Sequence, residues 1–312
     1  MTLHENYPTA AEVDVWCDKL LARADQLKFT ATAVADPPYE WRMGPWQTMP
    51  HSTYVRFDAK GCAPFYGFWQ KVPSGGPAPT LFHLPGYGAE MTSHPELVAA
   101  GYNVLHISPL GYATPQGPDD SKRRDGNWPV LPDTALSGGK CGYFDWLRDV
   151  LVAVRWASAQ PEVQANRLGF LGTSQGGGTA LLAASLLRDR GVKAVAADEP
   201  FLTGFPLAPS YPLPGAYGLA LTQLEAMADD PKTLRRAWRA LGEVDTLSHA
   251  HRLIMPVLLT AGSVDDVCPP ESIESLFAVL PGTRSYTLLH GLAHGYNPYF
   301  VQLAGAWFRS WI

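Results

Sequence analysis

From residue 80 onward the chain alternates between short apolar segments and longer segments of helical length. The short segments consist largely of Val, Leu, Ile, Phe and Ala, which predicts buried strands. Strands that alternate with helices in this way form a mainly parallel sheet with helices on both faces. The predicted strands are 80–86, 103–111, 167–174, 192–200, 255–263 and 284–291. The predicted helices are 94–102, 143–160, 177–190, 270–280 and 297–312.

A different pattern precedes this alternation. Residues 10–28 carry apolar side chains at helical spacing, which predicts an amphipathic helix. Two stretches rich in aromatic and β-branched residues then join around Gly61, as is typical of a hairpin. A Pro-rich stretch with helical segments, 203–250, interrupts the later alternation, and we expect it to cover the carboxyl ends of the strands. We therefore predict one domain over 1–312, with an N-terminal extension (1–75) and a cap-like insertion (203–250).

Composition excludes several classes of partner. Hydrophobic residues make up 46% of the chain and charged residues 17%, which is enough apolar material for a sizeable core. The net charge is −5, and the one basic triplet, Lys122–Arg124, is followed at once by Asp125, so we interpret it as a solvated loop. Without a clustered basic face, we expect neither a nucleic-acid nor a membrane partner.

The cysteines and the start of the chain indicate a cellular compartment. The first residues lack the basic-then-apolar pattern of a signal peptide, and no stretch approaches about eighteen consecutive apolar residues. The sequence therefore predicts a cytoplasmic protein. Four cysteines lie far apart without metal-ligand spacing, so we expect them to be reduced and to bind no metal. These are Cys17, Cys62, Cys141 and Cys268.

The most specific short motif is Gly172-Thr173-Ser174-Gln175-Gly176, which fits the pattern G-x-S-x-G. It lies between a predicted strand and a predicted helix, as a nucleophile turn requires. Such a turn holds the serine backbone in a strained conformation, so that Oγ stands clear of the sheet. Glycines on either side leave room for the neighbouring strand and helix, and Gly177 and Gly178 allow the helix to begin close by. We interpret Ser174 as a nucleophile.

A Gly-rich turn can also bind phosphate, but this one fits that function poorly. A P-loop needs Lys followed by Ser or Thr after its last glycine, and here Thr179-Ala180 follow. A dinucleotide-binding turn belongs in the first βαβ unit and reads G-x-G-x-x-G. Asp198 lies at about the distance of its acidic residue, yet the turn comes after several strands and lacks that pattern.

A serine nucleophile needs an adjacent base, which is oriented by a third group. In α/β hydrolases the order along the chain is serine, acid, histidine. Four histidines follow Ser174, and His294 lies between the last predicted strand and the last helix, where the sheet would deliver a base. His290 ends that strand and is the alternative. The other two are His249 and His251.

The acid is expected one strand earlier, on the turn after residues 257–262. Asp265 and Asp266 both lie there, and we favour Asp265, with Asp266 as a solvated turn residue. A carboxylate in this place would accept the imidazole Nδ1–H and stabilise the imidazolium. Asp198, at the end of the preceding strand, is the other candidate, or else a buried hydrogen-bonding group.

An acyl-transfer site also needs backbone N–H donors for the oxyanion. One is expected at Gln175, directly after the serine, and the second in the loop after an early strand, where we predict Tyr87. Apolar residues that could line an acyl pocket, or simply belong to the core, are Tyr87, Trp128, Phe201 and Phe205.

Several longer motifs are more specific than G-x-S-x-G alone. They are GYG (86–88), GTSQGGG (172–178), DEPFL (198–202), GSVDDVCPP (262–270) and AHGY (293–296). Together with the leading helix and hairpin, they resemble the acetyl xylan esterase and cephalosporin C deacetylase family of α/β hydrolases over most of the chain. The sequence departs from the family in three places. Pro109–Tyr112 replaces its Arg-Gly-Gln, and Gly295 replaces its usual Glu. The segment after residue 111 is also shorter than the one with which the family forms its oligomer interface and narrows its entrance.

The resemblance implies an α/β-hydrolase fold and the same site that the residues themselves suggest. The family's nucleophile, acid and base fall on Ser174, Asp265 and His294, and its oxyanion amides on Tyr87 and Gln175. The family usually forms hexamers, so the resemblance also implies a homo-oligomer.

We therefore predict a serine esterase that needs no cofactor and no metal and acts on small acetylated substrates. A peptidase or a lactone hydrolase on the same fold is one alternative. A binding protein with a degenerate site is the other, although a serine, an acid and a histidine in this order argue against it.

Overall fold

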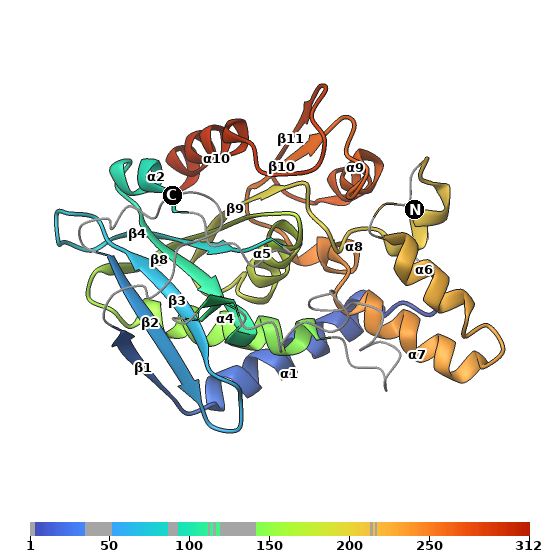
Figure 1. Ribbon diagram of the computed structural model, residues 1–312, viewed down its shortest axis with the longest axis horizontal. Coiled ribbons are helices and arrows are strands. Elements are labelled where there is room, and N and C mark those ends of the chain that lie inside the picture. The colour runs from blue at the N-terminus through green and yellow to red at the C-terminus, as the bar shows by residue number, and fades with distance from the viewer. Residues whose placement is uncertain are drawn as a thin grey trace.

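The computed structural model describes residues 4–34, 52–86, 93–111, 113–114, 117–118, 142–212, 215 and 217–312. A nine-stranded sheet, in the order β1-β2-β3-β5-β4-β8-β9-β10-β11, crosses the molecule (Figure 1). Its strands are β1 (Phe29–Val34), β2 (Ser52–Ala59), β3 (Phe65–Gln70), β4 (Ala78–Leu84), β5 (Asn103–Ser108), β8 (Val163–Thr173), β9 (Val192–Asp198), β10 (Val257–Gly262) and β11 (Arg284–Leu289). A separate two-stranded ribbon pairs β6 (Ala113–Thr114) with β7 (Gly117–Pro118).

Strand direction divides the sheet into two parts. From β5 to β11 all neighbouring strands run parallel, which confirms the predicted mainly parallel sheet. β3, β2 and β1 add an antiparallel edge, and the predicted hairpin is the pair β2–β3. We did not predict β1, because its sequence FTATAV contains small and polar residues and no strong apolar run. Pairing with β2, where Phe29 faces Ala59, holds it in the sheet.

Helices cover both faces of the sheet, as the alternation predicts. The helices are α1 (Ala10–Gln26), α2 (Pro95–Ala99), α4 (Tyr143–Ser158), α5 (Gln175–Leu186), α6 (Tyr217–Glu225), α7 (Pro231–Gly242), α8 (Thr246–His249), α9 (Pro270–Val279) and α10 (Pro298–Trp311), with short 3₁₀ turns η1 (Pro109–Gly111), η3 (Phe205–Ser210) and η4 (Ala250–Arg252). Among the described residues, none of these helices combines the length and apolar character needed to cross a bilayer.

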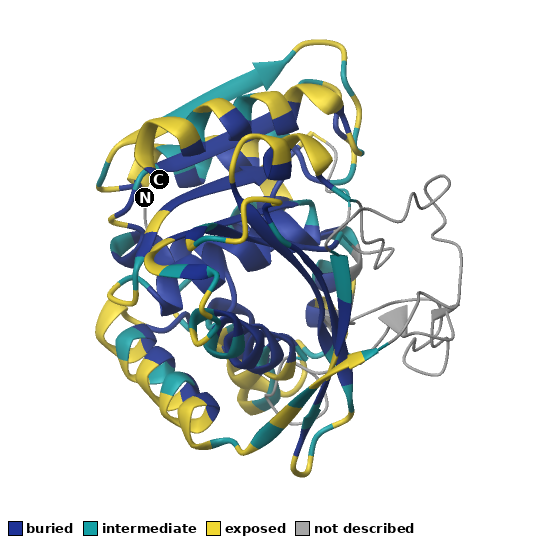
Figure 2. Ribbon diagram, turned by 90° about the vertical axis from the view of Figure 1, so that its left-hand side faces the viewer, coloured by how far each residue is buried: buried dark blue, intermediate teal, exposed yellow. Residues whose placement is uncertain are grey.

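Two apolar cores lie on opposite faces of the sheet, because successive side chains of a strand point in opposite directions. On β4, Leu81 packs with residues of α2 and α10, whereas Phe82 packs with the larger core that includes α1, α4 and α5. Val104 and Leu105 divide in the same way on β5. Figure 2 shows the inner strands as buried and the outer turns of the surface helices as exposed. The parallel strand ends therefore have rigid support from both sides.

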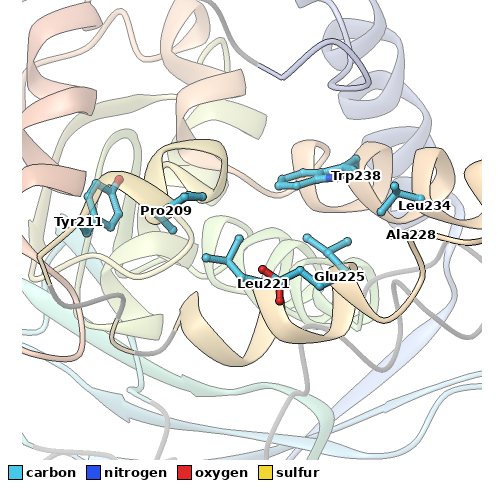
Figure 3. Close-up of a pocket in the computed structure, with 9 residues that line it drawn as sticks. Pro209, Tyr211, Leu221, Glu225, Ala228, Leu234 and Trp238 are labelled. Carbon is cyan, nitrogen blue, oxygen red and sulfur yellow. The ribbon is translucent and has the colours of Figure 1, made fainter.

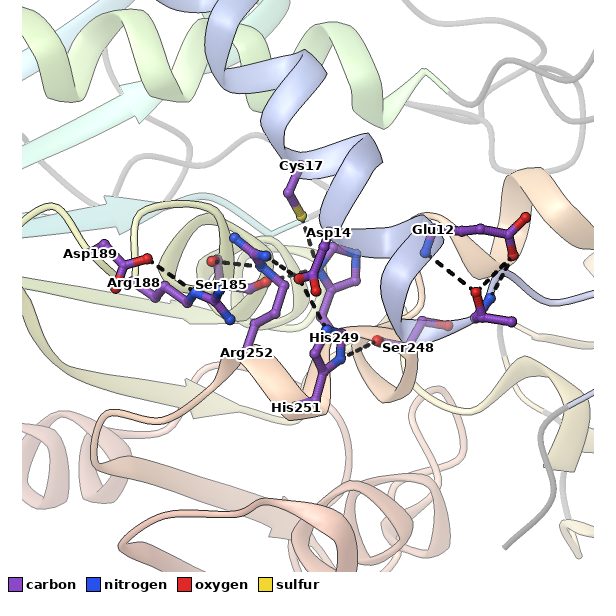
Figure 4. Close-up of polar contacts among 11 residues, drawn as sticks. Glu12, Asp14, Cys17, Ser185, Arg188, Asp189, Ser248, His249, His251 and Arg252 are labelled. Atoms are coloured by element: carbon purple, nitrogen blue, oxygen red, sulfur yellow. Dashed lines mark hydrogen bonds and ion pairs between the residues drawn. The ribbon is translucent and has the colours of Figure 1, made fainter.

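Polar contacts attach α1 to the rest of the fold (Figure 4). Asp14 accepts hydrogen bonds from Arg252 and from Nε2 of His251, the latter at 3.2 Å. Nδ1 of His249 lies 2.8 Å from the Ser185 hydroxyl, and Nε2 donates to the backbone oxygen of Glu243. Burial lowers the pKa of His249 to about 4, so its ring is neutral near pH 7. His249 and His251 thus hold α1, α5 and α8 together.

The insertion over 203–250 contains η3, α6, α7 and α8. Asp245 anchors its start, because this buried carboxylate accepts N–H bonds from Gly204 at 2.9 Å and from Phe205 at 3.0 Å. The hydroxyl of Tyr7 donates to the same carboxylate at 2.9 Å. Figure 1 shows α6 and α7 together at one side of the molecule. The position of the insertion over the carboxyl ends of the strands stays a prediction, as does the single domain over 1–312.

Candidate active site

The turn between β8 and α5 holds Ser174 in a strained conformation. Its φ of +58° and ψ of −123° are unusual for a residue with a side chain. Hydrogen bonds to the end of β9 and to the segment that follows it fix this conformation. The Ser174 N–H donates to the Asp198 oxygen at 2.8 Å, and the Phe201 N–H donates to the Ser174 oxygen at 3.0 Å. A strained residue that its surroundings hold so firmly is typical of a functional site.

The glycines around Ser174 are required by close backbone contacts. A Cβ on Gly176 would lie 2.1 Å from the backbone oxygen of Leu84, and one on Gly172 would lie 2.4 Å from the carbonyl carbon of Gly176. A Cβ on Gly178 would lie 1.9 Å from the backbone oxygen of Phe201. These glycines therefore serve the close packing of strand, turn and helix, as the sequence interpretation requires.

Three of the predicted side chains lie in one hydrogen-bonded chain. Nε2 of His294 is 2.9 Å from Oγ of Ser174, and Nδ1 of His294 is 2.8 Å from Oδ2 of Asp265. The other oxygen of Asp265 accepts the N–H groups of Val267 and Cys268, both at 2.8 Å. The structure thus brings together residues that come from three separate strand ends.

The alternative residues lie elsewhere. His290 and Asp266 are both exposed to solvent. Asp198 is buried below the turn, where it accepts hydroxyl hydrogen bonds from Thr260 at 2.5 Å and Thr173 at 3.1 Å. Burial raises the pKa of Asp198 to about 6. Of the two roles considered for Asp198, the structure shows the buried hydrogen-bonding group.

One of the two predicted oxyanion donors is described. Gln175 is the first residue of α5, and the first N–H groups of a helix have no acceptor within the helix. Its side chain is buried, and its Oε1 accepts a hydrogen bond from the Tyr143 hydroxyl at 2.9 Å. Tyr87 lies outside the described residues, as does Trp128. The helix start therefore presents the Gln175 N–H beside Ser174.

Opposing electrostatic effects act on His294. Burial of its ring lowers the pKa, whereas the hydrogen bond to Asp265 and the charges of Asp265, Glu199 and Asp198 raise it. The carboxylates outweigh burial, and the pKa is raised above its ordinary value. An imidazole in this setting is a stronger base and is more readily held as imidazolium.

Sequence reasoning missed Glu199, which follows β9. This carboxyl is fully buried, and its Oε2 lies 3.3 Å from Nδ1 of His294. Oε2 also accepts the N–H of Gly295 at 2.9 Å. The sequence places Glu199 directly after a parallel strand next to the one that ends before Asp265, but this place alone does not show that its side chain reaches His294. One oxygen or nitrogen from each of Glu199, Asp265 and His294 lies within 4.8 Å of the others, as in a metal site, but both ring nitrogens of His294 are already engaged in hydrogen bonds.

The two buried cysteines of the described fold are unsuited to nucleophilic chemistry. Cys268 is fully buried beside the serine, and burial raises the pKa of its thiol well above the ordinary value. Burial likewise raises the pKa of Cys17 to about 12. A thiol that stays protonated is a poor nucleophile. Ser174 therefore has no competing thiolate beside it among the described residues.

The insertion contains an apolar pocket of about 480 Å³ between η3, α6 and α7 (Figure 3). Leu221 and Leu224 of α6 line it, opposite Leu234 and Trp238 of α7. Phe205 does not belong to this lining. It is fully buried, with its ring 5.0 Å from that of Tyr217, so it is a core residue. Phe201 is partly buried and packs against the same ring at 5.0 Å.

The parallel sheet and the strained turn after β8 define an α/β-hydrolase fold, which confirms the predicted class. The family model described as acetyl xylan esterase matches residues 52–310, and the chain therefore belongs to the acetyl xylan esterase family. Membership identifies it as a carboxylic ester hydrolase.

Solved structures agree with this fold. Acetyl xylan esterase 1 from Thermoanaerobacterium sp. has a TM-score of 0.77 and 19% sequence identity, with 99% of this chain and 98% of that chain covered. An acetyl xylan esterase from Paenibacillus sp. has a TM-score of 0.76 and 20% identity, with 98% and 96% covered. An acylaminoacyl peptidase from Pyrococcus horikoshii has a TM-score of 0.59 and 18% identity, and it is covered over only 40% of its own length, against 82% of this chain. At such identities the likeness supports the fold alone.

Proposed function

We propose that this protein is a serine esterase that hydrolyses short-chain carboxylic esters, with acetylated sugars or similar small acetyl esters as substrates. The observation that carries the proposal is the hydrogen-bonded chain from Ser174 through His294 to Asp265. The family supports the choice of substrate, since the model that matches this chain describes acetyl xylan esterase.

The geometry supports a two-step mechanism. Oγ of Ser174 attacks the ester carbonyl while Nε2 of His294 takes its proton, and the resulting imidazolium is stabilised by Asp265. The N–H of Gln175, with Tyr87 as the expected second donor, binds the oxyanion. His294 then protonates the leaving alcohol. Water hydrolyses the acyl-enzyme by the same route, and no step needs a cofactor.

The alternatives have less support. The peptidase neighbour is a much longer protein, of which this fold covers less than half. A lactone hydrolase would use the same three side chains, so turnover of lactones and aminoacyl amides must be compared with that of acetyl esters. A binding protein would not need a strained serine in contact with a base. The homo-oligomer and the cytoplasmic location rest on the sequence and the family resemblance.

Acyl-chain length tests the substrate class. We expect kcat/KM to be highest for p-nitrophenyl acetate and to fall as the acyl chain lengthens through butyrate to octanoate. We also expect release of acetate from acetylated xylo-oligosaccharides, and little turnover of aminoacyl amides. Steady-state rates over the series measure this directly. A maximum at octanoate, or faster cleavage of amides than of acetyl esters, would contradict the assignment.

The pH dependence of activity follows from the raised pKa of His294. The neutral ring acts as the base, and a raised pKa means that the ring keeps its proton to higher pH. Activity should therefore be lost as the pH falls through a value above 6.5, the ordinary pKa of histidine. A profile of kcat/KM for p-nitrophenyl acetate between pH 5 and pH 9 reports this pKa in the free enzyme. An apparent pKa below 6.5 for the acid limb would show that the carboxylates do not outweigh the effect of burial on the pKa of His294.

A further inference from the structure

Glu199 occupies a position that the fold holds under strain. Its φ is +43°, in the left-handed region that a residue with a side chain rarely adopts. The backbone that leads into Glu199 is fixed, because the Glu199 N–H donates to the oxygen of Thr260 at 2.9 Å and the preceding residue accepts the N–H of Ser174. This conformation directs the side chain to the same point that Asp265 reaches from the next strand. Such strain is frequent where a side chain has a functional position.

Two carboxyl oxygens converge on one ring nitrogen. Nδ1 of His294 lies 2.8 Å from Oδ2 of Asp265 and 3.3 Å from Oε2 of Glu199. The same Oε2 accepts the N–H of Gly295 at 2.9 Å, so Glu199 contacts both the ring and the backbone directly after it. Its other oxygen, Oε1, is buried and has no hydrogen-bond partner among the described residues.

The carboxyls around His294 differ in the number of donors that stabilise their charge. Asp265 accepts two backbone N–H groups and Asp198 accepts two hydroxyls, whereas Glu199 accepts one N–H. Burial and the charge of Asp198 raise the pKa of Glu199, whereas the Gly295 N–H and the charge of His294 lower it, so Glu199 ionises most readily when His294 is protonated. The titratable groups that face Glu199 are Asp198, Asp265, Cys268 and His294. Among these, only the imidazolium form of His294 would favour an ionised Glu199.

We propose that Glu199 is a second carboxyl that positions His294 and supports its charge. It holds the loop after β11 through the Gly295 N–H and places a carboxyl oxygen 3.3 Å from Nδ1 of His294, beside the hydrogen bond of that nitrogen to Asp265. The inference rests on the proposed function, in which His294 is the base. A purely structural Glu199 would affect stability and leave the titration of His294 unchanged.

Two substitutions separate these roles. Glu199→Gln keeps an oxygen that can accept the Gly295 N–H but removes the ionisable group, so the acid limb of kcat/KM should move to lower pH by about 0.5–1 unit. Glu199→Ala removes the acceptor as well. It should show the same shift together with a kcat about tenfold or more below that of Glu199→Gln, because the ring loses its positioning. Asp266→Asn is the matched control, since it removes an exposed carboxylate close by, and its limb should stay in place.

Hydrolysis of p-nitrophenyl acetate across pH 5–9 supplies these values, and thermal melts confirm that each variant is folded. An unchanged acid limb in Glu199→Gln would overturn the proposal, as would equal shifts in Glu199→Gln and Asp266→Asn. A wild-type protein that neither hydrolyses esters nor reacts with a fluorophosphonate overturns the proposed function as well. If the wild type is active and the acid limb of kcat/KM in Glu199→Gln is unshifted, this inference alone is overturned.

If Glu199→Ala does not fold, the role of Glu199 can be tested in the variant Asp265→Ala instead. In Asp265→Ala, Glu199 is the remaining carboxyl at Nδ1, so adding Glu199→Gln should lower the residual rate of fluorophosphonate labelling about tenfold further. Equal labelling rates in the single and double variants would show that Glu199 does not act on His294.

Discussion

Replacement of Ser174 by alanine is expected to reduce ester hydrolysis by at least about a thousandfold while leaving the fold intact. The hydroxyl oxygen is the atom that attacks the ester, and it is hydrogen-bonded to Nε2 of His294. Because Oγ takes no part in the core, its loss should leave the melting temperature close to that of the wild type. Initial rates with p-nitrophenyl acetate, labelling by a fluorophosphonate and a thermal melt measure the three quantities.

The fold supplies a matched control for this substitution. Ser185 also lies beside a histidine, with its hydroxyl 2.8 Å from Nδ1 of His249, but this pair is buried between α5 and α8. Ser185→Ala should keep its activity and its labelling, at a cost of about 1 kcal/mol in the free energy of unfolding. Full activity in Ser174→Ala, or loss of labelling only in Ser185→Ala, would sink the assignment of the nucleophile.

Replacement of Gly176 by alanine should damage both stability and activity. The new Cβ would lie 2.1 Å from the backbone oxygen of Leu84. This clash can be relieved only if β4 or the turn itself shifts. We expect the free energy of unfolding to fall by about 3 kcal/mol or more. Any variant that folds should also lose kcat, since the turn that carries Ser174 is displaced. Denaturant unfolding and steady-state kinetics provide the two measurements.

Gly305 in α10 is the control for this effect. A Cβ there would lie 3.6 Å from the side chain of Leu97, which is an ordinary contact. Alanine has a higher helix propensity than glycine. Gly305→Ala should therefore leave activity unchanged and stabilise the protein by up to about 1 kcal/mol. Similar losses in Gly176→Ala and Gly305→Ala would mean that close packing at the turn is not the reason for Gly176.

Much of the fold was predictable because its signals are local. Apolar runs such as 167–174 and helical spacing such as that of 10–28 indicate strands and helices without knowledge of their neighbours. The structure extends the first to Val163–Thr173 and ends the second at Gln26. β1 escaped prediction because its residues favour no structure strongly, and only the partner strand β2 makes it part of the sheet.

Some residues of the candidate site were likewise predictable from the sequence, and one was not. Ser174, Asp265 and His294 could be chosen because each follows a predicted strand in the order that this fold uses, and the structure brings their side chains into contact. Gln175 followed from its place after the serine. Glu199 could not be chosen with the same reasoning, because its approach to His294 depends on a left-handed φ that no sequence pattern announces.

Periodicity and motif spacing are properties of neighbours along the chain, so they indicate the class of fold, the family and the residues that stand at the strand ends. How those ends converge depends on the packing of distant segments. Asp198, Glu199 and Asp265 follow or end two adjacent parallel strands, and the charges of all three act on one imidazole. Their pKa values depend on burial and on one another's charge, which arise only when segments distant in sequence pack together.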